Sequence, residues 1–110
     1  MGRKKKSILV NPEREVCALC GSEFDLEWHH VMHGTANRKI ADKYGLALWL
    51  CRSCHDELHF SKETIWRNID MGLMAYAQKK FEEKYGHEKW MQLFMKNYES
   101  TRELALWTYI

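Results

Sequence analysis

Two short hydrophobic runs in the first half of the chain predict two β-strands. Leu26 to Met32 and Leu46 to Cys51 are rich in Trp, Leu and Val, which suit the strands of a hairpin-like unit. Between them, Thr35 is placed to cap a short helix over residues 36–44, and Gly45 supplies the left-handed residue that ends such a helix. We therefore expect a strand, a loop helix and a second strand in this order.

A further helix is predicted directly after the second strand. Ser53 and Asp56 have the spacing of a capping box, so this helix is expected to begin at Cys54. Residues four positions apart share one face of a helix, and His55 and His59 are therefore expected to point the same way.

Residues 62–110 place hydrophobic side chains at steps of three and four, the spacing of amphipathic helices. One stripe ends before Gly86 and another follows it. Their members are Trp66, Ile69, Leu73, Ala77, Phe81 and Tyr85, then Trp90, Leu93, Phe94, Asn97 and Tyr98. We expect two C-terminal helices packed against the first half of the chain, which gives an α+β fold.

The four cysteines form two C-x-x-C pairs, Cys17 with Cys20 and Cys51 with Cys54. Two residues between thiolates let both sulfurs reach one tetrahedral ion, and soft sulfur ligands select zinc over hard cations. Gly21 eases the tight turn after the first pair. The pairs predict a structural Zn²⁺ that adds stability to a core that is thin in a chain of 110 residues.

Hydropathy gives an expectation about the cellular compartment. No apolar run approaches the roughly 20 residues of a membrane helix, and residues 1–6 are not followed by the hydrophobic segment of a signal peptide. We therefore expect a cytoplasmic protein without a membrane partner. Thiols stay reduced there, which again favours metal ligands over disulfides.

The formal net charge of +2 conceals an uneven distribution of basic residues. Four of the 17 gather at the beginning of the chain: Arg3, Lys4, Lys5 and Lys6. Clustered Lys and Arg bind nucleic-acid backbone by displacing counterions, so residues 1–12 are expected to form a flexible basic arm with little packing. Residues 13–61 would then form a metal-stabilised core and residues 62–110 a helical extension.

Five of the six histidines lie between positions 29 and 59, close to the cysteine pairs in the sequence. Folding the two pairs around one ion would place His30 on a strand opposite the helix that carries His55 and His59. An imidazole has a pKa of about 6.5, so it can accept a proton from water at neutral pH and can also bind divalent ions.

The chain resembles the HNH, or ββα-metal, nuclease family through the segments Leu-Glu-Trp-His-His-Val and Leu-Trp-Leu-Cys-Arg-Ser-Cys-His and the cysteine pairs that frame them, over roughly residues 16–60. The resemblance implies that His30 is a general base and that His29 and His55 hold a divalent ion, with His59 as a further ligand that some members use. It implies Mg²⁺ or Mn²⁺ as the ion, although imidazoles also accept Ni²⁺ or Zn²⁺. The implied products carry a 5′ phosphate and a 3′ hydroxyl.

The resemblance departs at the family's middle residue, an Asn before the second strand, where this chain has Gly45. Glycine permits the same left-handed turn but lacks the side chain that braces the loop. Asn37 either substitutes for it from the loop helix or is an ordinary exposed or capping residue.

Basic residues around the expected site either hold the DNA backbone or are solvated surface charge. They are Arg38, Lys39, Lys43 and Arg52. His33 is either a substrate contact or a residue without a role, and His87 is expected to be structural.

Residues 77–90 and the later Lys-Asn-Tyr are similar to extensions of short HNH proteins of phages and prophages. The leading hypothesis is thus a metal-dependent DNA endonuclease of low sequence specificity, encoded by a phage and acting in a bacterial host cell. Two alternatives stay open: a zinc-stabilised DNA-binding module without catalysis, and a structure-selective nuclease acting on branched DNA or on RNA. The sequence leaves the oligomeric state open as well.

Overall fold

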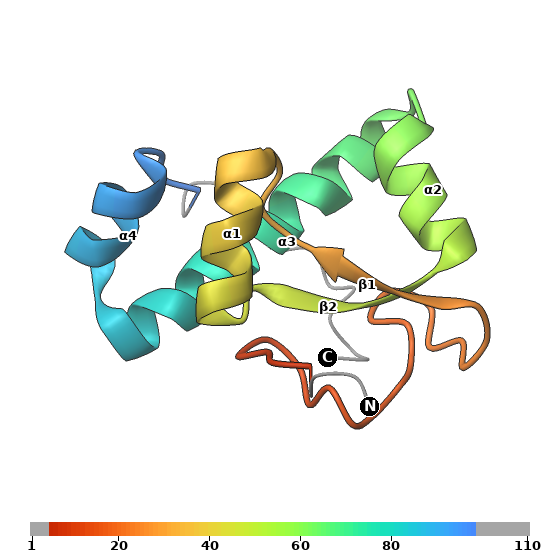
Figure 1. The fold of residues 1–110 in the computed structure, drawn as a ribbon. Helices are drawn as coiled ribbons and strands as arrows, with labels where there is room; N and C mark the ends of the chain where they lie inside the picture. The colour runs from red at the N-terminus through yellow and green to blue at the C-terminus, as the bar shows by residue number, and fades with distance from the viewer. Residues whose placement is uncertain (1–4, 99–110) are drawn as a thin grey trace.

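The computed structural model describes residues 5–98, which contain one two-stranded antiparallel sheet and four helices (Figure 1). This arrangement confirms the predicted α+β class. No helix within the described residues is both long and apolar enough to cross a bilayer. The predictions for Arg3, Lys4 and residues 99–110 lie outside the described part. In chain order the elements are β1 (Leu26–His30), α1 (Thr35–Tyr44), β2 (Ala47–Cys51), α2 (Arg52–Phe60), α3 (Thr64–Tyr85) and α4 (His87–Phe94).

The two strands pair in antiparallel register, and the pairing ends with His30 opposite Ala47. The prediction that the first strand continues to Met32 is wrong by two residues. One backbone bond follows the ladder, from the Val31 amide to the Leu46 carbonyl at 3.0 Å. The hydrophobic run continues through Val31 and Met32 because both side chains are buried in the core, although the strand has already ended.

The loop helix α1 differs from the prediction at its beginning and agrees at its end. Thr35 is the first helical residue instead of the cap, and Gly34 takes the cap position with a φ of 97° and no side-chain bond. Gly45 ends the helix in the left-handed conformation at φ 73°, as predicted. A Cβ on Gly45 would also lie 3.1 Å from the Ser7 Cα and the Ile8 N, so a larger residue would require this backbone to shift.

Helix α2 begins two residues before the predicted start at Cys54. Cys51 takes the N-cap position, and its Sγ accepts a 3.5 Å hydrogen bond from the backbone amide of Cys54. The predicted cap, Ser53, therefore lies inside the first turn. A cysteine can cap here because the same sulfur lies within the cysteine cluster described below.

The N-terminal segment packs against the body of the protein from Ser7 onward, which corrects the expectation of little packing over residues 1–12. The Ser7 hydroxyl donates to the Ala47 carbonyl at 2.6 Å, and the Ile8 amide donates to the Gly45 carbonyl at 2.9 Å. Leu9 is buried, and its carbonyl accepts a bond from the Tyr76 hydroxyl. Hydrophobic residues next to the basic run are the reason, because they cover the core beside α1 and α3.

Helix α3 is the longest helix of the described residues (Figure 1). It contacts α2 toward one end and α4 at the other. Its predicted apolar stripe is confirmed at four positions that are buried: Ile69, Leu73, Ala77 and Phe81. The helical extension therefore shares one hydrophobic core with the strands.

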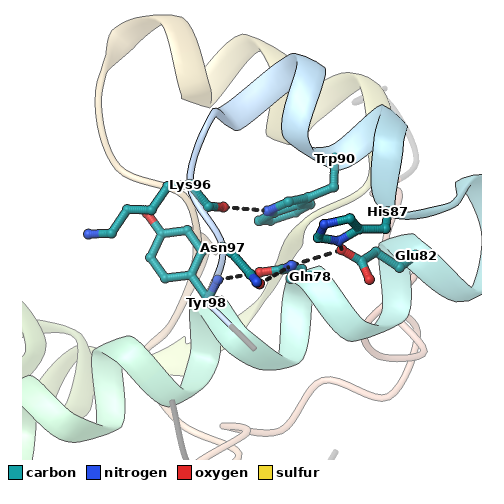
Figure 2. A network of polar contacts seen from close by, with 7 residues as sticks. All are labelled: Gln78, Glu82, His87, Trp90, Lys96, Asn97 and Tyr98. Atoms are coloured by element: carbon teal, nitrogen blue, oxygen red, sulfur yellow. Dashed lines mark hydrogen bonds and ion pairs between the residues drawn. The ribbon is translucent and has the colours of Figure 1, made fainter. Parts of the chain in front are cut away.

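Residues 95–98, which follow α4, are not helical, although Asn97 and Tyr98 had the spacing of the second stripe. Gln78 on α3 is fully buried and holds this segment instead (Figure 2). Its Oε1 accepts from the Tyr98 amide at 2.6 Å, and its Nε2 donates to Asn97 Oδ1 and Glu82 Oε2 at 2.8 Å each. The helical prediction is wrong at these two residues because the buried Gln78 amide forms hydrogen bonds with them in a non-helical segment.

Candidate metal centres

The four cysteines form a first cluster, here called the sulfur cluster. Their Sγ atoms lie within 4.8 Å of one another, and all four are free thiols. Sulfurs bound at about 2.3 Å to one tetrahedral ion would lie ~3.8 Å apart, and the Sγ atoms of Cys20 and Cys51 are 3.6 Å apart. The sulfur cluster could therefore hold a structural metal such as zinc, as the two C-x-x-C pairs predicted.

Backbone hydrogen bonds build the sulfur cluster. Gly21, at φ 78°, lets its amide donate to the Cys17 carbonyl at 2.9 Å, and the Ala18 amide reaches the Trp49 carbonyl of β2 at 2.9 Å. The loop of Cys17 and Cys20 is thus hydrogen-bonded to β2, the strand that ends at Cys51. Burial, followed by repulsion from the Cys17 sulfur, raises the pKa of the Cys54 thiol. A bound cation would offset both effects and favour the thiolate, the form of cysteine that binds a metal.

Three histidines form a second cluster, here called the imidazole cluster: His29, His55 and His59. One ring nitrogen of each lies within 4.8 Å of the other two. His29 comes from β1, while His55 and His59 share one face of α2, as their spacing predicted. The Nε2 atoms of His55 and His59 are 3.0 Å apart. Two nitrogens at about 2.1 Å from one ion would lie ~3.0 to 3.4 Å apart, so this pair fits a shared metal.

His29 carries the clearest sign of a missing partner. Its side chain is 2% exposed, and its Nε2 is buried without a hydrogen-bond partner among the described residues. Burial, with further repulsion from His55, His33, His59 and His30, lowers the pKa of His29 to about 3, so the ring is neutral. A buried polar atom without a partner costs about 1 to 3 kcal/mol. A metal ion bound to the imidazole cluster would remove this cost.

A carboxylate orients one ring of the imidazole cluster. Glu27 Oε1 lies 2.7 Å from His55 Nδ1, so this nitrogen carries the proton and donates to the carboxylate. The lone pair of His55 is then on Nε2, the atom beside His59. Histidines that bind metals in proteins are commonly held in this way. Glu27 was not among the residues singled out in the sequence, although it stands two residues before His29 and so shares its face of β1.

His30 lies beside the imidazole cluster but is not one of the three rings that converge. Its Nε2 is 2.5 Å from Asp42 Oδ1 of α1. The carboxylate can only accept, so Nε2 carries the proton and Nδ1 keeps its lone pair. Asp42 is a second carboxylate that sequence analysis did not identify.

The imidazole cluster lines a cavity of about 440 Å³. His30, His33 and Arg38 line the same cavity, together with Trp28. The other basic residues singled out in the sequence, Lys39, Lys43 and Arg52, are exposed outside the cavity lining. Polar side chains thus surround an opening in which an anionic ligand and a cation could meet.

Three further residues singled out in the sequence have defined contacts: Asn37, His33 and His87. Asn37 Nδ2 donates to the His33 carbonyl at 2.8 Å, so this side chain braces the loop between β1 and α1. His33 Nε2 lies 2.9 Å from both carboxylate oxygens of Asp70 on α3. This hydrogen bond outweighs partial burial and raises the pKa of His33. His87 pairs with Glu82 at 2.6 Å at the junction of α3 and α4 (Figure 2).

Comparisons with known proteins find distant similarity to intron-encoded proteins. The chain is 35% identical over 65 residues to an uncharacterized 91 kDa protein in cob intron of Schizosaccharomyces pombe, and the alignment covers 52% of the chain. It is 38% identical over 58 residues to a COX1/OXI3 intron 2 protein of Saccharomyces cerevisiae, which covers 43% of the chain. These alignments span only 8% and 7% of the two relatives. No family model and no solved structure matches.

Proposed function

We propose that this chain is a metal-dependent endonuclease of the HNH type that hydrolyses phosphodiester bonds in DNA. The observation that carries the proposal is the imidazole cluster, in which a buried His29 Nε2 without a partner lies beside the rings of His55 and His59. Three nitrogen donors at the edge of an open cavity are typical of a site that binds a metal and keeps room for a substrate.

In this proposal His29, His55 and His59 hold one divalent ion, with Mg²⁺ or Mn²⁺ as the physiological candidates. The ion would bind a phosphate oxygen and stabilise the charge that develops on the phosphate and on the leaving 3′ oxygen. Glu27 keeps the His55 lone pair on Nε2 by accepting the Nδ1 proton at 2.7 Å. The sulfur cluster supports the same segments from behind, because Cys54 and His55 are neighbours on α2.

His30 is the general base in this proposal. Asp42 accepts the Nε2 proton and fixes the ring, which leaves the Nδ1 lone pair to take a proton from a water molecule. Attack of the resulting hydroxide on phosphorus breaks the bond to the 3′ oxygen, which takes up a proton from solvent, leaving a 5′ phosphate and a 3′ hydroxyl. Asp42 stabilises the imidazolium that forms, as a carboxylate partner does for a catalytic histidine.

Three further observations support a role on nucleic acid. Arg38 lines the cavity and can contact a phosphate, while Lys39, Lys43 and Arg52 supply exposed positive charge on the same elements. Asn37 braces the loop that the family's middle Asn would brace. Both relatives are named for introns, and the chain matches a short part of each, as a small module within a larger protein would.

Plasmid cleavage tests the proposal directly. Zinc-loaded protein incubated with supercoiled plasmid and Mg²⁺, Mn²⁺ or Ni²⁺ is expected to nick the DNA. His30→Ala should lower the rate by about 10² to 10⁴, the usual contribution of a general base, while zinc content and the circular dichroism spectrum stay unchanged. His87→Ala is the matched control, because this histidine also pairs with a carboxylate but lies outside the cavity lining.

Equal nicking by His30→Ala and the parent protein would contradict the assignment of the base. Binding of DNA without cleavage under any of the three metals would instead favour a zinc-stabilised binding module. Parallel assays with linear duplex, a four-way junction, single-stranded DNA and RNA distinguish a general DNA endonuclease from a structure-selective one.

A further inference from the structure

The pair formed by His33 and Asp70 has no part in the function proposed above. His33 follows β1 in the loop, and Asp70 lies on α3, outside the segment that resembles the HNH family. The two oxygens of Asp70 each lie 2.9 Å from His33 Nε2. The pair is therefore a direct polar link between α3 and the cavity wall.

The His33 ring lies next to the imidazole cluster but is not part of it. Its centroid is 6.0 Å from that of His29 and 5.8 Å from that of His59. It lines the same cavity, and no nitrogen of His33 joins the group of three converging donors. His33 thus lies in the cavity wall beside the imidazole cluster, where a ligand that enters the cavity can reach it.

Both the ring and the backbone of His33 are held in place, and the second ring nitrogen is left for a ligand. Asp70 fixes Nε2, and Asn37 fixes the backbone through its bond to the His33 carbonyl. Within the described chain, Nδ1 of His33 makes no hydrogen bond. The side chain is 43% exposed, whereas that of Asp70 is 19% exposed, so the carboxylate lies behind the imidazole. The orientation of the ring is therefore fixed before a ligand binds, unlike that of a fully exposed ion pair, whose side chains are mobile.

We propose that His33 donates a hydrogen bond from Nδ1 to a phosphate oxygen of the nucleic acid next to the scissile bond, and that Asp70 is the residue that positions it. A protonated imidazole donates from both ring nitrogens, and this form is favoured when the ring lies between two anions, the Asp70 carboxylate and a phosphate oxygen. The inference rests on the proposed nuclease function. It makes α3 part of the substrate-binding site, so the helical extension does more than stabilise the fold.

The test compares His33→Ala, Asp70→Asn and the double variant in the full chain loaded with zinc. His33→Ala is expected to raise KM for a short DNA duplex about tenfold, the loss of one charge-assisted hydrogen bond, with kcat within about twofold of the parent. Asp70→Asn should raise KM by a smaller factor. The double variant should be no worse than His33→Ala, because Asp70 acts only through His33.

Two binding measurements separate this inference from its alternatives. The dissociation constant of the duplex, measured by fluorescence anisotropy in a His30→Ala background, should rise in parallel with KM. The affinity for Mn²⁺, measured by calorimetry, should stay unchanged. His87→Asn is the control, because it breaks a histidine–carboxylate pair of the same kind away from the cavity.

Weaker Mn²⁺ binding in His33→Ala would make this histidine a metal ligand and overturn the inference. Unchanged KM and DNA affinity with a lower melting temperature would make the pair a tether of α3 and would overturn it as well. If the parent protein cleaves no nucleic acid, the proposed function fails, yet the anisotropy measurement still decides whether His33 contacts the phosphate backbone.

Discussion

The sulfur cluster and the imidazole cluster both draw residues from α2, but the protein surrounds their donor atoms differently. Three of the four cysteines are buried, and backbone hydrogen bonds shape the loop that carries the first pair. In the imidazole cluster only His29 is buried, and His55 is held by the exposed side chain of Glu27. The first cluster is closed and the second opens into a cavity. Structural and catalytic metal sites differ in the same way.

This contrast explains why the two clusters should respond differently to mutation. The sulfur cluster joins the loop of Cys17 and Cys20 to β2 and α2, so we expect the fold to depend on a metal bound there. The imidazole cluster lies on elements that the hydrophobic core already fixes, and its buried His29 Nε2 costs stability in the absence of a ligand. Three changes test the comparison, and their expected effects on free energy decrease in order.

The largest effect is expected from loss of the sulfur cluster. Cys51→Ser, or removal of zinc with a chelator, should unfold the region of residues 16–61, because structural zinc sites contribute on the order of 10 kcal/mol. Cys51 also caps α2, so the helix loses a bond at its N-terminus. Far-UV circular dichroism measures the loss, and added zinc should reverse the effect of the chelator. A spectrum that is unchanged after complete removal of zinc would show that the core folds without this cluster.

A smaller effect is expected when the carboxylate behind the imidazole cluster is removed. Glu27→Gln should weaken binding of Mn²⁺ or Ni²⁺ by about 10- to 100-fold, because a residue that orients a metal-binding histidine has this influence. Calorimetric titration of the zinc-loaded protein measures the affinity. Glu23→Gln is the matched control, since Glu23 is an exposed carboxylate in the loop before β1. Equal affinities in both variants and the parent would remove Glu27 from the site.

The smallest effect has the opposite sign. His29→Leu replaces a buried polar ring that lacks a partner by an apolar side chain of similar size, so the zinc-loaded protein should gain about 1 kcal/mol of stability. This corresponds to a rise of roughly 4 to 8 °C in Tm for a domain of this size. Thermal unfolding without added Mn²⁺ measures it, and Mn²⁺ binding should be lost in the same variant. A lower Tm would mean that His29 stabilises the fold, so that both clusters, and not the sulfur cluster alone, contribute to stability.

Much of the fold followed from local patterns in the sequence. The spacing of Ile69, Leu73, Ala77 and Phe81 identified the buried face of α3, and Gly45 marked the end of α1. The errors lie at the ends of elements. The first strand stops before Met32, and α2 begins before Cys54, because core burial and a sulfur cap decided these boundaries.

The docking of residues 7–10 is a second kind of error. The basic run at the beginning of the chain indicated a free arm, but Leu9 is buried against the core, and Ser7 and Ile8 bond to the backbone around β2. Composition alone could not show this, because a short apolar segment docks only where the fold leaves a matching surface.

The sequence by itself determined the kinds of donor atom and the local part of their geometry. Two residues between cysteines and three between His55 and His59 place these donors on one turn or one helix face, whatever the rest of the chain does.

Only the tertiary structure decided which carboxylate holds which imidazole. Asp42 pairs with His30 across 12 positions, Glu27 with His55 across 28, and Asp70 with His33 across 37. The chain has 15 acidic residues, and local sequence preference carries no information on which of them folding brings to a distant histidine.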